Sequence, residues 1–355
     1  MKNTGHGLKI GKRRIGPSTD VYILAEVGSN HGGSLAHAKR FIDMAKRTGC
    51  DAVKFQSLFA DGIATRLKNA STRIDDGFRK HGAYLHDVYK RSETPRGWLR
   101  PLREYARVKK IDFVCTPFDE ESVDVLGQLD IDAFKISSFE ITYERLLRKV
   151  ARYRKPVILS TGMADVAEIR RAVRILTRSG VTQIAVLHCN IGYPPPSSDI
   201  HLQAIPLISR KIKRPVGFSD HTVGAEASLA AVALGARILE KHVRLGRVSA
   251  PDYSFAMGPA ELEKYVASVR RVSQFLGRSW KGVSRAEKVY YRRGRRGLYA
   301  AKTLDKGRRL TPDNIAILRP CMGIPASEYD RLLGHSTRRG IRGGAPIQWA
   351  DVSRS

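Results

Sequence analysis

Residues 216–242 read VGFSDHTVGAEASLAAVALGARILEKH, two apolar runs separated by a Gly- and Ala-rich stretch of helical character. His221 follows the first run and His242 ends the second. Two strands joined by one helix lie side by side in a parallel sheet, so both imidazoles are expected to project from neighbouring carboxyl ends. Either histidine alone would be interpreted as a hydrogen-bonded residue near a strand end. As a pair beside Ser219 and Glu240, they predict half of an open metal site or a catalytic site.

Apolar runs of strand length recur through most of the chain, and each is followed by a helix-like stretch. The runs are Tyr22 to Val27, Ala52 to Phe55, Ile111 to Thr116, Ala133 to Ile136, Pro156 to Ser160, Ile184 to His188, Pro215 to Phe218 and Ile238 to His242. The amphipathic segments Ser34 to Thr48 and Asp165 to Ser179 lie between them and begin with good N-cap residues. Continuous apolar strands alternating with helices indicate a parallel sheet, and eight such units close a barrel. The predicted fold class is α/β, a (β/α)8 TIM barrel followed by a small, mostly β domain.

The predicted barrel spans residues 21–281 and is flanked by three other parts. A short hairpin forms an extension over residues 1–20. An Arg- and Gly-rich linker covers residues 282–297, and a compact, mostly β domain covers residues 298–355. The long segment from Leu58 to Pro95 interrupts the second unit of the barrel. A loop of that length on the catalytic face is usually a lid or a substrate collar, and a plain surface insertion is the alternative.

The composition excludes several classes of protein. No apolar run is long enough to cross a bilayer, and the first twenty residues are basic without the apolar segment of a secretory signal. Cys50, Cys115, Cys189 and Cys321 show no Cys-x-x-Cys pairing, so we expect buried thiols in a reducing compartment. We therefore expect a cytoplasmic protein without a membrane partner.

Charge is the unusual feature, because 63 Lys and Arg against 34 Asp and Glu leave a net charge of +29. Such an excess attracts polyanions, so a basic, nucleic-acid-associated protein on a barrel scaffold is an alternative of a different class. However, the basic residues are spread over nearly every predicted helix, and no zinc finger or RNA-binding sheet motif is present. A solvated basic surface that also draws in small anionic substrates is the preferred interpretation, and nucleic acid is not expected as a partner.

Each predicted strand passes to its loop through a residue able to do chemistry. In chain order these residues are Glu26, Lys54 with Gln56, Thr116, Lys135 with Ser138, Ser160, His188 with Asn190, Ser219 with His221, and Glu240 with His242. Active sites of barrels of this kind lie at the carboxyl ends of the strands. Thr116 or Ser160 taken singly could be an ordinary loop residue. Their joint occurrence predicts an active site at this end.

The residue types at these positions suggest a substrate. Two ammonium groups and several hydroxyls suit a phosphate plus a carboxylate, and this predicted set is Lys54, Thr116, Lys135, Ser138, Ser160 and Ser219. His221 and His242 can hold a divalent ion that leaves positions open for water and a substrate carbonyl. Glu26 and Glu140 are candidates for moving protons or orienting water. The chemistry equally permits an aldolase or an isomerase.

At this point the motifs carry a resemblance over nearly the whole chain. They are Ala25–His31, Val53–Gln56, Thr116–Phe118, Phe134–Glu140, Leu159–Met163, His188-Cys189, Tyr193-Pro194, Phe218–Thr222 and Glu240–His242. The chain resembles the N-acetylneuraminate (sialic acid) synthase family. That family joins phosphoenolpyruvate to an N-acetyl hexosamine such as N-acetylmannosamine, giving a nine-carbon 2-keto acid and phosphate. Its C-terminal antifreeze-like domain is similar to Leu298–Val352.

The resemblance implies a role for each candidate residue. His221 and His242 would hold Mn2+, or Mg2+ or Co2+, facing the sugar aldehyde, and Glu26 and Glu140 would position water or move protons. The residues that would bind phosphoenolpyruvate are Lys54, Thr116, Lys135, Ser138, Ser160 and Ser219. The residues that would contact the sugar are Gln56, Tyr193 and Asp252, with Arg319 reaching in from the partner of a domain-swapped homodimer.

The sequence departs from the family pattern at the sugar. Ile191 stands where the family generally presents a polar or small residue, and Asn190 could compensate. Ser137–Glu140 and Tyr84–Pro95 are more similar to the pseudaminic acid synthases, which use a diacetamido-trideoxy hexose. A pseudaminic or legionaminic acid synthase is therefore the first alternative. Another phosphoenolpyruvate-dependent deoxy sugar acid synthase is the second, and an ice-binding role for the C-terminal domain rests on analogy of fold alone.

Overall fold

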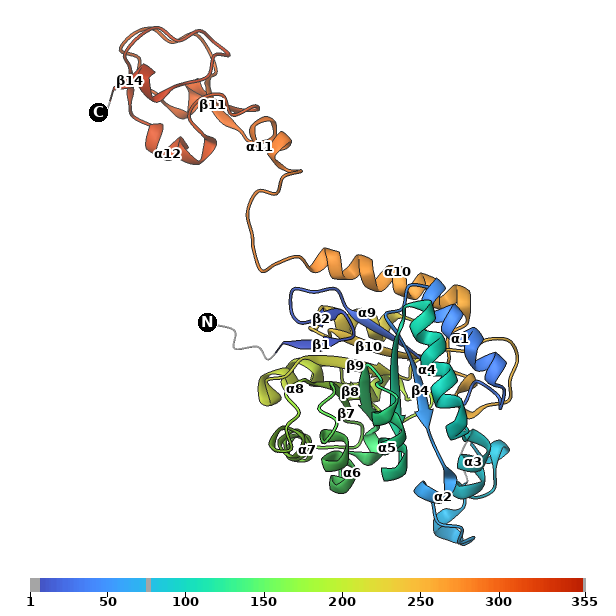
Figure 1. Cartoon of the computed structure of the whole chain (residues 1–355). Helices are drawn as coiled ribbons and strands as arrows, with labels where there is room; N and C mark the ends of the chain where they lie inside the picture. The colour runs from blue at the N-terminus through green and yellow to red at the C-terminus, as the bar shows by residue number, and fades with distance from the viewer. Residues whose placement is uncertain (1–6, 75–77, 354–355) are drawn as a thin grey trace. The chain divides into compact units, whose positions relative to one another are not determined.

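The computed structural model describes residues 7–74 and 78–353. The chain divides into two compact units, Met1–Gly277 and Arg278–Ser355 (Figure 1), and each is described by itself. The first six residues of the predicted extension and the last two of the predicted C-terminal domain lie outside the described residues. Among the described residues, no helix combines the length and the apolar character needed to cross a membrane.

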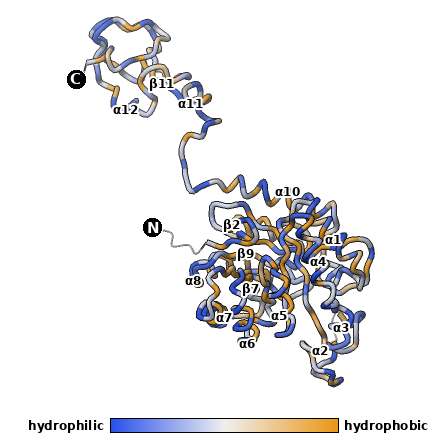
Figure 2. Tube along the Cα trace, viewed as in Figure 1, coloured by the Kyte–Doolittle hydropathy of each residue, from blue (hydrophilic) through white to orange (hydrophobic). Residues whose placement is uncertain are grey.

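The first unit is the predicted (β/α)8 barrel. Its parallel strands are β3 (Tyr22–Glu26), β4 (Ala52–Ser57), β5 (Asp112–Pro117), β6 (Ala133–Ile136), β7 (Val157–Ser160), β8 (Ile184–Cys189), β9 (Val216–Asp220) and β10 (Ile238–His242). They form a closed barrel in chain order, and β10 pairs with β3 to complete it. The strands are almost entirely buried, and Figure 2 shows hydrophobic residues concentrated in the middle of the unit, where the strands lie. The predicted fold class is therefore confirmed.

Helices form a ring outside the barrel strands (Figure 1). They are α1 (Leu35–Arg47), α4 (Leu99–Lys109), α5 (Glu120–Gln128), α6 (Glu144–Ala151), α7 (Val166–Arg178), α8 (Ala204–Ile212), α9 (Glu226–Ala233) and α10 (Pro259–Leu276). The predicted N-caps are confirmed, because the Ser34 side chain accepts from His37 N and the Asp165 side chain accepts from Glu168 N. The apolar face of each helix packs on the outward side chains of the strands in one large core cluster.

A hairpin closes the amino-terminal end of the barrel. Its strands β1 (Leu8–Ile10) and β2 (Arg13–Ile15) pair antiparallel, and their apolar side chains share a core cluster with residues inside the barrel. Lys9 N donates to Gln183 Oε1 at 2.8 Å, just before β8, and Arg13 pairs with Asp51 at 2.9 Å, just before β4. Gly11 has φ +51° and leaves no room for a Cβ beside Asp112 at the start of β5. Among the described residues of the first unit, the hairpin therefore fills the amino-terminal end of the barrel, and the cavity opens at the carboxyl end.

The segment between β4 and α4 forms a collar at that carboxyl end. It contains α2 (Ala60–Ile63), α3 (Leu85–Ser92) and the short 3-10 turns Ala70–Thr72, Arg79–His81 and Arg96–Trp98. Glu93 Oε1 accepts from Ala60 N at 3.0 Å, which ties the two ends of the collar together. His31 Nε2 lies 3.0 Å from Thr94 Oγ1, and Arg96 pairs with Asp119 at 3.1 Å. These contacts anchor the collar to the loops after β3 and β5.

The second unit is small and contains short antiparallel sheets, as predicted, together with two short helices within its described part. It contains α11 (Lys288–Gly294), the antiparallel pair β11 (Gly297–Ala300) and β12 (Ile315–Leu318), α12 (Tyr329–Leu332), and the pair β13 (Ser336–Thr337) and β14 (Val352–Ser353). A core cluster that includes Leu298, Leu310 and Ile347 holds it together. The helix α11 falls within residues 282–297, where the sequence suggested a linker. The exact domain boundaries stay a prediction.

Candidate active site

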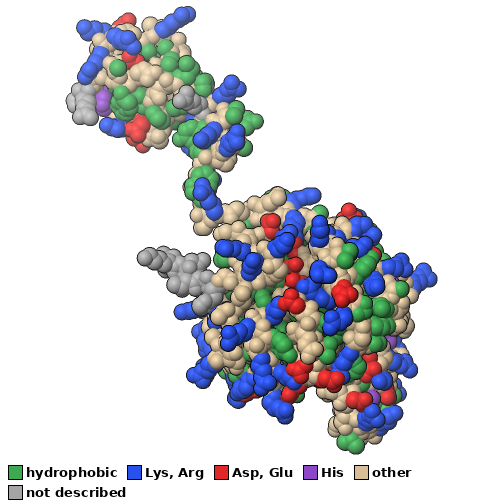
Figure 3. Space-filling view, viewed as in Figure 1, with side chains coloured by type: hydrophobic (Ala, Val, Ile, Leu, Met, Phe, Trp, Pro, Cys, Tyr) green, Lys and Arg blue, Asp and Glu red, His purple; other side chains and the backbone are tan. Residues whose placement is uncertain are grey.

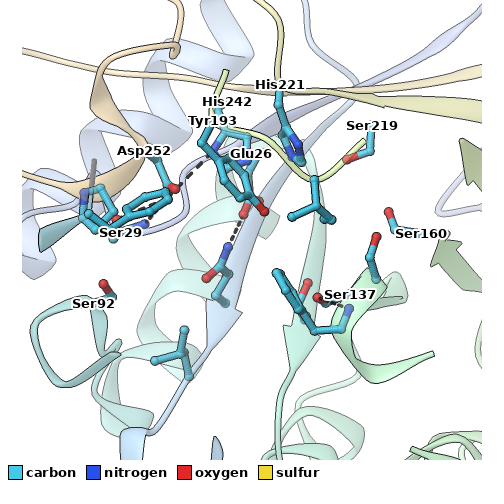
Figure 4. Close-up of a pocket in the computed structure, with 18 of the residues that line it drawn as sticks. Glu26, Ser29, Ser92, Ser137, Ser160, Tyr193, Ser219, His221, His242 and Asp252 are labelled. Atoms are coloured by element: carbon cyan, nitrogen blue, oxygen red, sulfur yellow. Dashed lines mark hydrogen bonds and ion pairs between the residues drawn. The ribbon is translucent and has the colours of Figure 1, made fainter. Parts of the chain in front are cut away.

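A cavity of about 690 Å³ lies at the carboxyl end of the barrel strands, under the collar (Figure 4). Twelve of the candidate residues line it, and they come from every barrel strand or the loop that follows. These residues are Glu26, Lys54, Gln56, Thr116, Lys135, Ser138, Ser160, Tyr193, Ser219, His221, His242 and Asp252. Parallel strands deliver them to one end because all their carboxyl ends point the same way. The convergence expected from the sequence is therefore observed.

Two lysines and two glutamates form a buried charge network at the cavity floor. Lys54 Nζ lies 2.9 Å from Glu26 Oε2 and 3.8 Å from Glu240 Oε1, and Lys135 Nζ lies 3.5 Å from Glu240 Oε2. Gln56 Nε2 donates to Glu26 Oε1 at 2.6 Å. All four charged side chains are at most 4 % exposed. Such buried charges persist only when they are paired or hydrogen-bonded.

The network gives its two carboxyls different proton affinities. Burial raises the pKa of Glu26, and the nearby Glu240 charge adds to this although Lys54 opposes it. Burial also opposes ionisation of Glu240, but the ammonium groups of Lys135 and Lys54 outweigh it and lower the Glu240 pKa. Burial lowers the pKa of Lys135, and Glu240 compensates this only in part. The two carboxyls of the floor therefore differ in how firmly they hold a proton, as expected when burial and neighbouring charges act on them differently.

Hydroxyl groups surround the lysines. Thr116 Oγ1 accepts from Lys54 Nζ at 3.2 Å, Ser219 Oγ donates to Glu240 Oε1 at 3.0 Å, and Ser138 Oγ accepts from Gly162 N at 2.9 Å. Ser160 Oγ is buried and has no hydrogen-bond partner among the described residues. A buried hydroxyl without a partner is costly unless a ligand satisfies it. The donors near Ser160 are therefore suited to an oxyanion.

The two histidines of β9 and β10 face each other across the top of this floor. Their ring centroids are 5.3 Å apart. His221 Nδ1 lies 2.9 Å from the Asn190 carbonyl, so it must donate there. Burial opposes protonation of His221, but the neighbouring Cys189 outweighs burial and raises the His221 pKa. His242 Nδ1 is buried, lacks a hydrogen-bond partner among the described residues and lies 3.8 Å from Asp252 Oδ2. Burial lowers the pKa of His242 to about 3, so its imidazole is neutral.

These features suit a divalent ion, but the described residues do not supply a complete set of ligands for it. Neutral imidazoles with free lone pairs are normal ligands for transition-metal ions. However, in the part of the chain that is described, no group of three or more His, Cys, Asp or Glu side chains is arranged to hold a metal. A bound ion would therefore take further ligands from water or substrate, as an open catalytic site requires.

The strands that carry the histidines are clamped behind the cavity. Asp220 Oδ2 accepts from Lys241 Nζ at 2.9 Å and from Ser228 Oγ at 2.6 Å, and Asp220 Oδ1 accepts from Thr222 N at 2.8 Å. Asp220 and Lys241 are fully buried and do not line the cavity. Residues 220 and 241 are register partners in β9 and β10, so this ion pair fixes the spacing of His221 and His242.

Asp252 lies on one side of the histidines, and Ser219 and Ser160 lie on the other (Figure 4). Asp252 Oδ2 accepts from both Ser29 N and Ser29 Oγ at 3.1 Å. Gly28 has φ +52°, and a Cβ there would lie 2.2 Å from Asp252 Oδ2, so glycine is needed for this approach. The ring of Tyr193 lies 4.7 Å from that of His221. This end of the cavity combines aromatic and hydrogen-bonding groups, as sugar sites do.

Two candidates do not line the cavity. Glu140 is buried in the 3-10 turn Ser138–Glu140, its Oε2 has no hydrogen-bond partner among the described residues, and burial raises its pKa to about 7. Arg319 follows β12 in the second unit, and its role stays a prediction. His188, noted as a strand-end residue, turns away from the cavity and contacts the Ile200 carbonyl at 2.7 Å.

The structure adds residues that sequence reasoning missed. Glu240 was noted only as a neighbour of His242, yet it contacts both lysines. Ser29 was not singled out, because its partner Asp252 is 223 positions away. The apolar wall of the collar consists of the lining residues Ile74, Phe78, Leu85, Val88 and Tyr89, and Phe139 and Ile191 line the cavity from the loops after β6 and β8. The sequence marked Tyr84–Pro95 as a stretch of interest, but only the three-dimensional contacts show which of its side chains line the cavity.

The fold and the cavity define a class, a (β/α)8 barrel whose cavity holds two buried lysines beside a pair of histidines. Comparison with known proteins defines the family. The sequence model of the NeuB family matches residues 41–281 and that of the SAF domain matches residues 295–353, and the chain belongs to the NeuB family. The resemblance to sialic acid synthases with an antifreeze-like domain is thereby confirmed.

Relatives span nearly the whole chain. It is 37 % identical to an N,N'-diacetyllegionaminic acid synthase of Campylobacter jejuni, covering 88 % of this chain and 94 % of the relative. It is 33 % identical to a pseudaminic acid synthase of the same species, covering 93 % and 96 %. The solved N-acetylneuraminic acid (sialic acid) synthetase of Leptospira borgpetersenii is 32 % identical, covers 82 % of this chain and 98 % of its own, and superposes with a TM-score of 0.71. The chain is therefore an enzyme of the sialic, pseudaminic and legionaminic acid synthase family.

Proposed function

We propose that the protein condenses phosphoenolpyruvate with the open-chain aldehyde of an acetamido hexose, giving a nonulosonic (sialic-type) acid and phosphate. One observation carries the proposal. The two buried lysines of the cavity floor lie in the same cavity as two histidines, of which His242 is neutral, that could serve a carbonyl. The names of the relatives support the same reaction type.

The floor would hold the donor substrate. Lys54 and Lys135 would pair with the phosphate and carboxylate of phosphoenolpyruvate, and the hydroxyls of Thr116, Ser138, Ser160 and Ser219 would orient it. The Ser160 hydroxyl, which has no partner among the described residues, and the two buried ammonium groups support this assignment. Substrate binding would replace the lysine–glutamate contacts with stronger lysine–phosphate contacts.

His221 and His242 would hold the ion, Mn2+ or else Mg2+ or Co2+. When bound, it would act as a Lewis acid on the sugar carbonyl. The Nδ1 of His242, which has no partner among the described residues, and the Asn190 contact that orients the His221 ring support this role. Asp252, fixed by Ser29, and Gln56 and Tyr193 would bind the sugar chain so that its aldehyde carbon lies against the donor.

The bonds would change in three steps. C3 of phosphoenolpyruvate attacks the aldehyde carbon, the aldehyde oxygen takes up a proton to become a hydroxyl, and the new C–C bond leaves a cationic C2. Water adds at C2 and loses one proton, which replaces the proton taken up by the aldehyde oxygen. The C2 hydroxyl of the tetrahedral intermediate then loses its proton as the bond from C2 to the phosphate oxygen breaks, and this gives the 2-keto acid and protonated phosphate. Glu26, which lines the cavity and whose pKa burial raises, would orient the water or accept its proton. Glu140 does not line the cavity, and its carboxyl, whose pKa burial raises to about 7, would assist proton transfer from outside the lining.

A specific observation favours the second candidate for the sugar, a diacetamido-trideoxy hexose as in pseudaminic or legionaminic acid synthesis. The apolar wall of the collar suits a C6 methyl group and an additional acetyl group better than it suits free hydroxyls. N-acetylmannosamine is the other sugar to be tested. We further propose a cytoplasmic, domain-swapped homodimer in which Arg319 of one copy closes the site of the other.

The reaction is tested with the full chain, phosphoenolpyruvate and Mn2+. Each of a panel of hexosamines is added in turn, including N-acetylmannosamine and 2,4-diacetamido-2,4,6-trideoxy hexoses, and phosphate release is measured together with the mass of the product. A sugar-dependent release of phosphate with a product three carbons longer is expected. Release with arabinose 5-phosphate or erythrose 4-phosphate, and none with acetamido sugars, would establish the deoxy sugar acid alternative instead.

A further inference from the structure

A second cavity, of about 250 Å³, lies wholly within the second unit. It is lined by Arg331, His335, Arg338, Trp349 and Val352. These residues come from α12, from β14 and from the turns that flank β13 and β14. The volume is below the roughly 300–1,000 Å³ of ordinary ligand pockets, which suits one oxyanion or a single sugar ring.

The lining is built from an aromatic face and cations. The Arg331 guanidinium stacks over the Trp349 ring at 4.8 Å and is held from outside by Glu328 at 3.1 Å. The His335 ring meets the same indole edge-on at 6.1 Å. Trp349 remains 39 % exposed, which is unusual for an indole that serves only the core. The arrangement keeps an indole and a guanidinium open to a ligand.

Two polar groups of this cavity have no side-chain partner among the described residues. His335 Nδ1 is buried and makes no hydrogen bond to any described residue. Among the described residues, no carboxylate lies within ion-pair distance of Arg338, whereas its neighbour Arg339 is neutralised by Asp351. Residues 278–355 carry 18 Lys and Arg against six Asp and Glu, so the surroundings also favour an anion.

We propose that this cavity is a binding site for a small oxyanion, the carboxylate or phosphate of a sugar acid or sugar phosphate. Arg338 and the His335 imidazole bind the oxyanion, and Arg331 and Trp349 contact the attached ring. The site lies outside the barrel cavity and is independent of the proposed reaction. The second unit would thus bind a ligand of its own, apart from the substrates of the barrel cavity.

The test uses the indole N–H signals of the full chain labelled with ¹⁵N-tryptophan, which contains three tryptophans. Trp349→Phe identifies the Trp349 signal. Inorganic phosphate, N-acetylneuraminate and the neutral N-acetylmannosamine are titrated separately. We expect a saturable shift of the Trp349 signal with phosphate, N-acetylneuraminate or both, and the response identifies the source of the oxyanion. No saturable shift with either anion, or an equal shift with the neutral sugar, would overturn the proposal.

Matched variants localise the effect. Arg338→Gln removes the unpaired guanidinium, and we expect the apparent affinity to fall roughly tenfold, as for the loss of one charge-assisted hydrogen bond. Arg342→Gln changes an exposed arginine of the same unit that does not line the cavity, and should leave the titration unchanged. Both side chains are exposed, so both variants should fold, and an unchanged melting temperature checks this. An Arg338→Gln titration identical to that of the unaltered chain would also overturn the proposal.

Discussion

At the scale of single residues, the catalytic proposal rests on side chains left unsatisfied by the protein. Ser160 Oγ, His242 Nδ1 and Glu140 Oε2 are buried without hydrogen-bond partners among the described residues. Each costs stability, because burial without a partner forfeits the hydrogen bond to water. All three lie in the cavity or close to it, and functional sites are where proteins tolerate such unfavourable buried groups.

His242→Ala should abolish phosphate release, because the histidine pair loses one member, with little effect on folding. The imidazole makes no hydrogen bond to the described protein, so its removal costs mainly packing, about 1–2 kcal/mol. Melting temperature and phosphate release are measured on the same preparation. His188→Ala is the matched control, since His188 lies at the end of a neighbouring strand, binds the Ile200 carbonyl and does not line the cavity. Activity retained by His242→Ala would exclude the histidine pair.

Glu140 should make stability depend on pH. Burial raises its pKa from 4.5 to about 7, so the folded state holds a proton that the unfolded state has already lost. Stability is then greatest below pH 4.5 and falls as the pH rises to 7, by up to about 3 kcal/mol from this group. Urea unfolding of the unaltered chain and of Glu140→Gln is compared across this range. The advantage of the unaltered chain over the variant should shrink with rising pH, and Glu104→Gln, an exposed control, should show a constant difference.

At the scale of elements, the barrel strands were predictable and their ends were not. Each strand core is a continuous apolar run, which is why the eight predicted runs coincide with β3 to β10. β4 continues to Ser57 and β9 to Asp220, because ladder hydrogen bonds keep the backbone extended through polar residues. The clamp between Asp220 and Lys241 was also invisible, since its partners lie on different strands. Sequence therefore identified the residues of the site better than their partners.

Phe78→Ala should weaken the preference for deoxygenated sugars. Phe78 belongs to the apolar wall of the collar, and its ring meets Tyr193 edge-on at 5.5 Å. Removing it exposes the sugar to water, which costs the methyl-bearing substrate about 1–2 kcal/mol more than a hydroxylated one. We expect the ratio of kcat/KM for a 2,4-diacetamido-2,4,6-trideoxy hexose to that for N-acetylmannosamine to fall roughly tenfold. Leu67→Ala, a mostly exposed collar residue outside the cavity, is the control.

At the scale of the whole molecule, charge and assembly are separate questions. Lys and Arg are distributed over the face of the first unit in Figure 3, with Asp and Glu among them. Many of these acids form surface ion pairs, such as Glu144 with Arg148 and Arg171. The basic composition thus leaves the local surface mixed in sign on this face. The proposed domain-swapped dimer is a different matter, and it is tested by asking whether Arg319 of one copy is needed in the site of the other.

Mixing two inactive variants should restore activity if the dimer is domain-swapped. In a heterodimer of His242→Ala and Arg319→Ala, one barrel keeps His242 and receives an intact Arg319 from the other copy. Random exchange between equal amounts should recover about a quarter of the unaltered activity. Activity is measured after mild denaturation and joint refolding, with each variant refolded alone as the control. No recovery, with heterodimers present by mass, would show that Arg319 does not complete the site of the other copy.

The hairpin at the amino-terminal end plugs one end of the barrel. Because Leu8, Ile10 and Ile15 fill that end, we expect substrates and products to pass through the carboxyl end, beneath the collar. Lys54 and Lys135 lie within the strands, whereas Tyr193 and Asp252 lie in the loops beyond them, so the molecule held by the lysines should bind first and leave last. We expect compulsory-order kinetics, with phosphoenolpyruvate binding ahead of the sugar and phosphate as a competitive inhibitor against phosphoenolpyruvate alone. Random-order initial-rate patterns would contradict this.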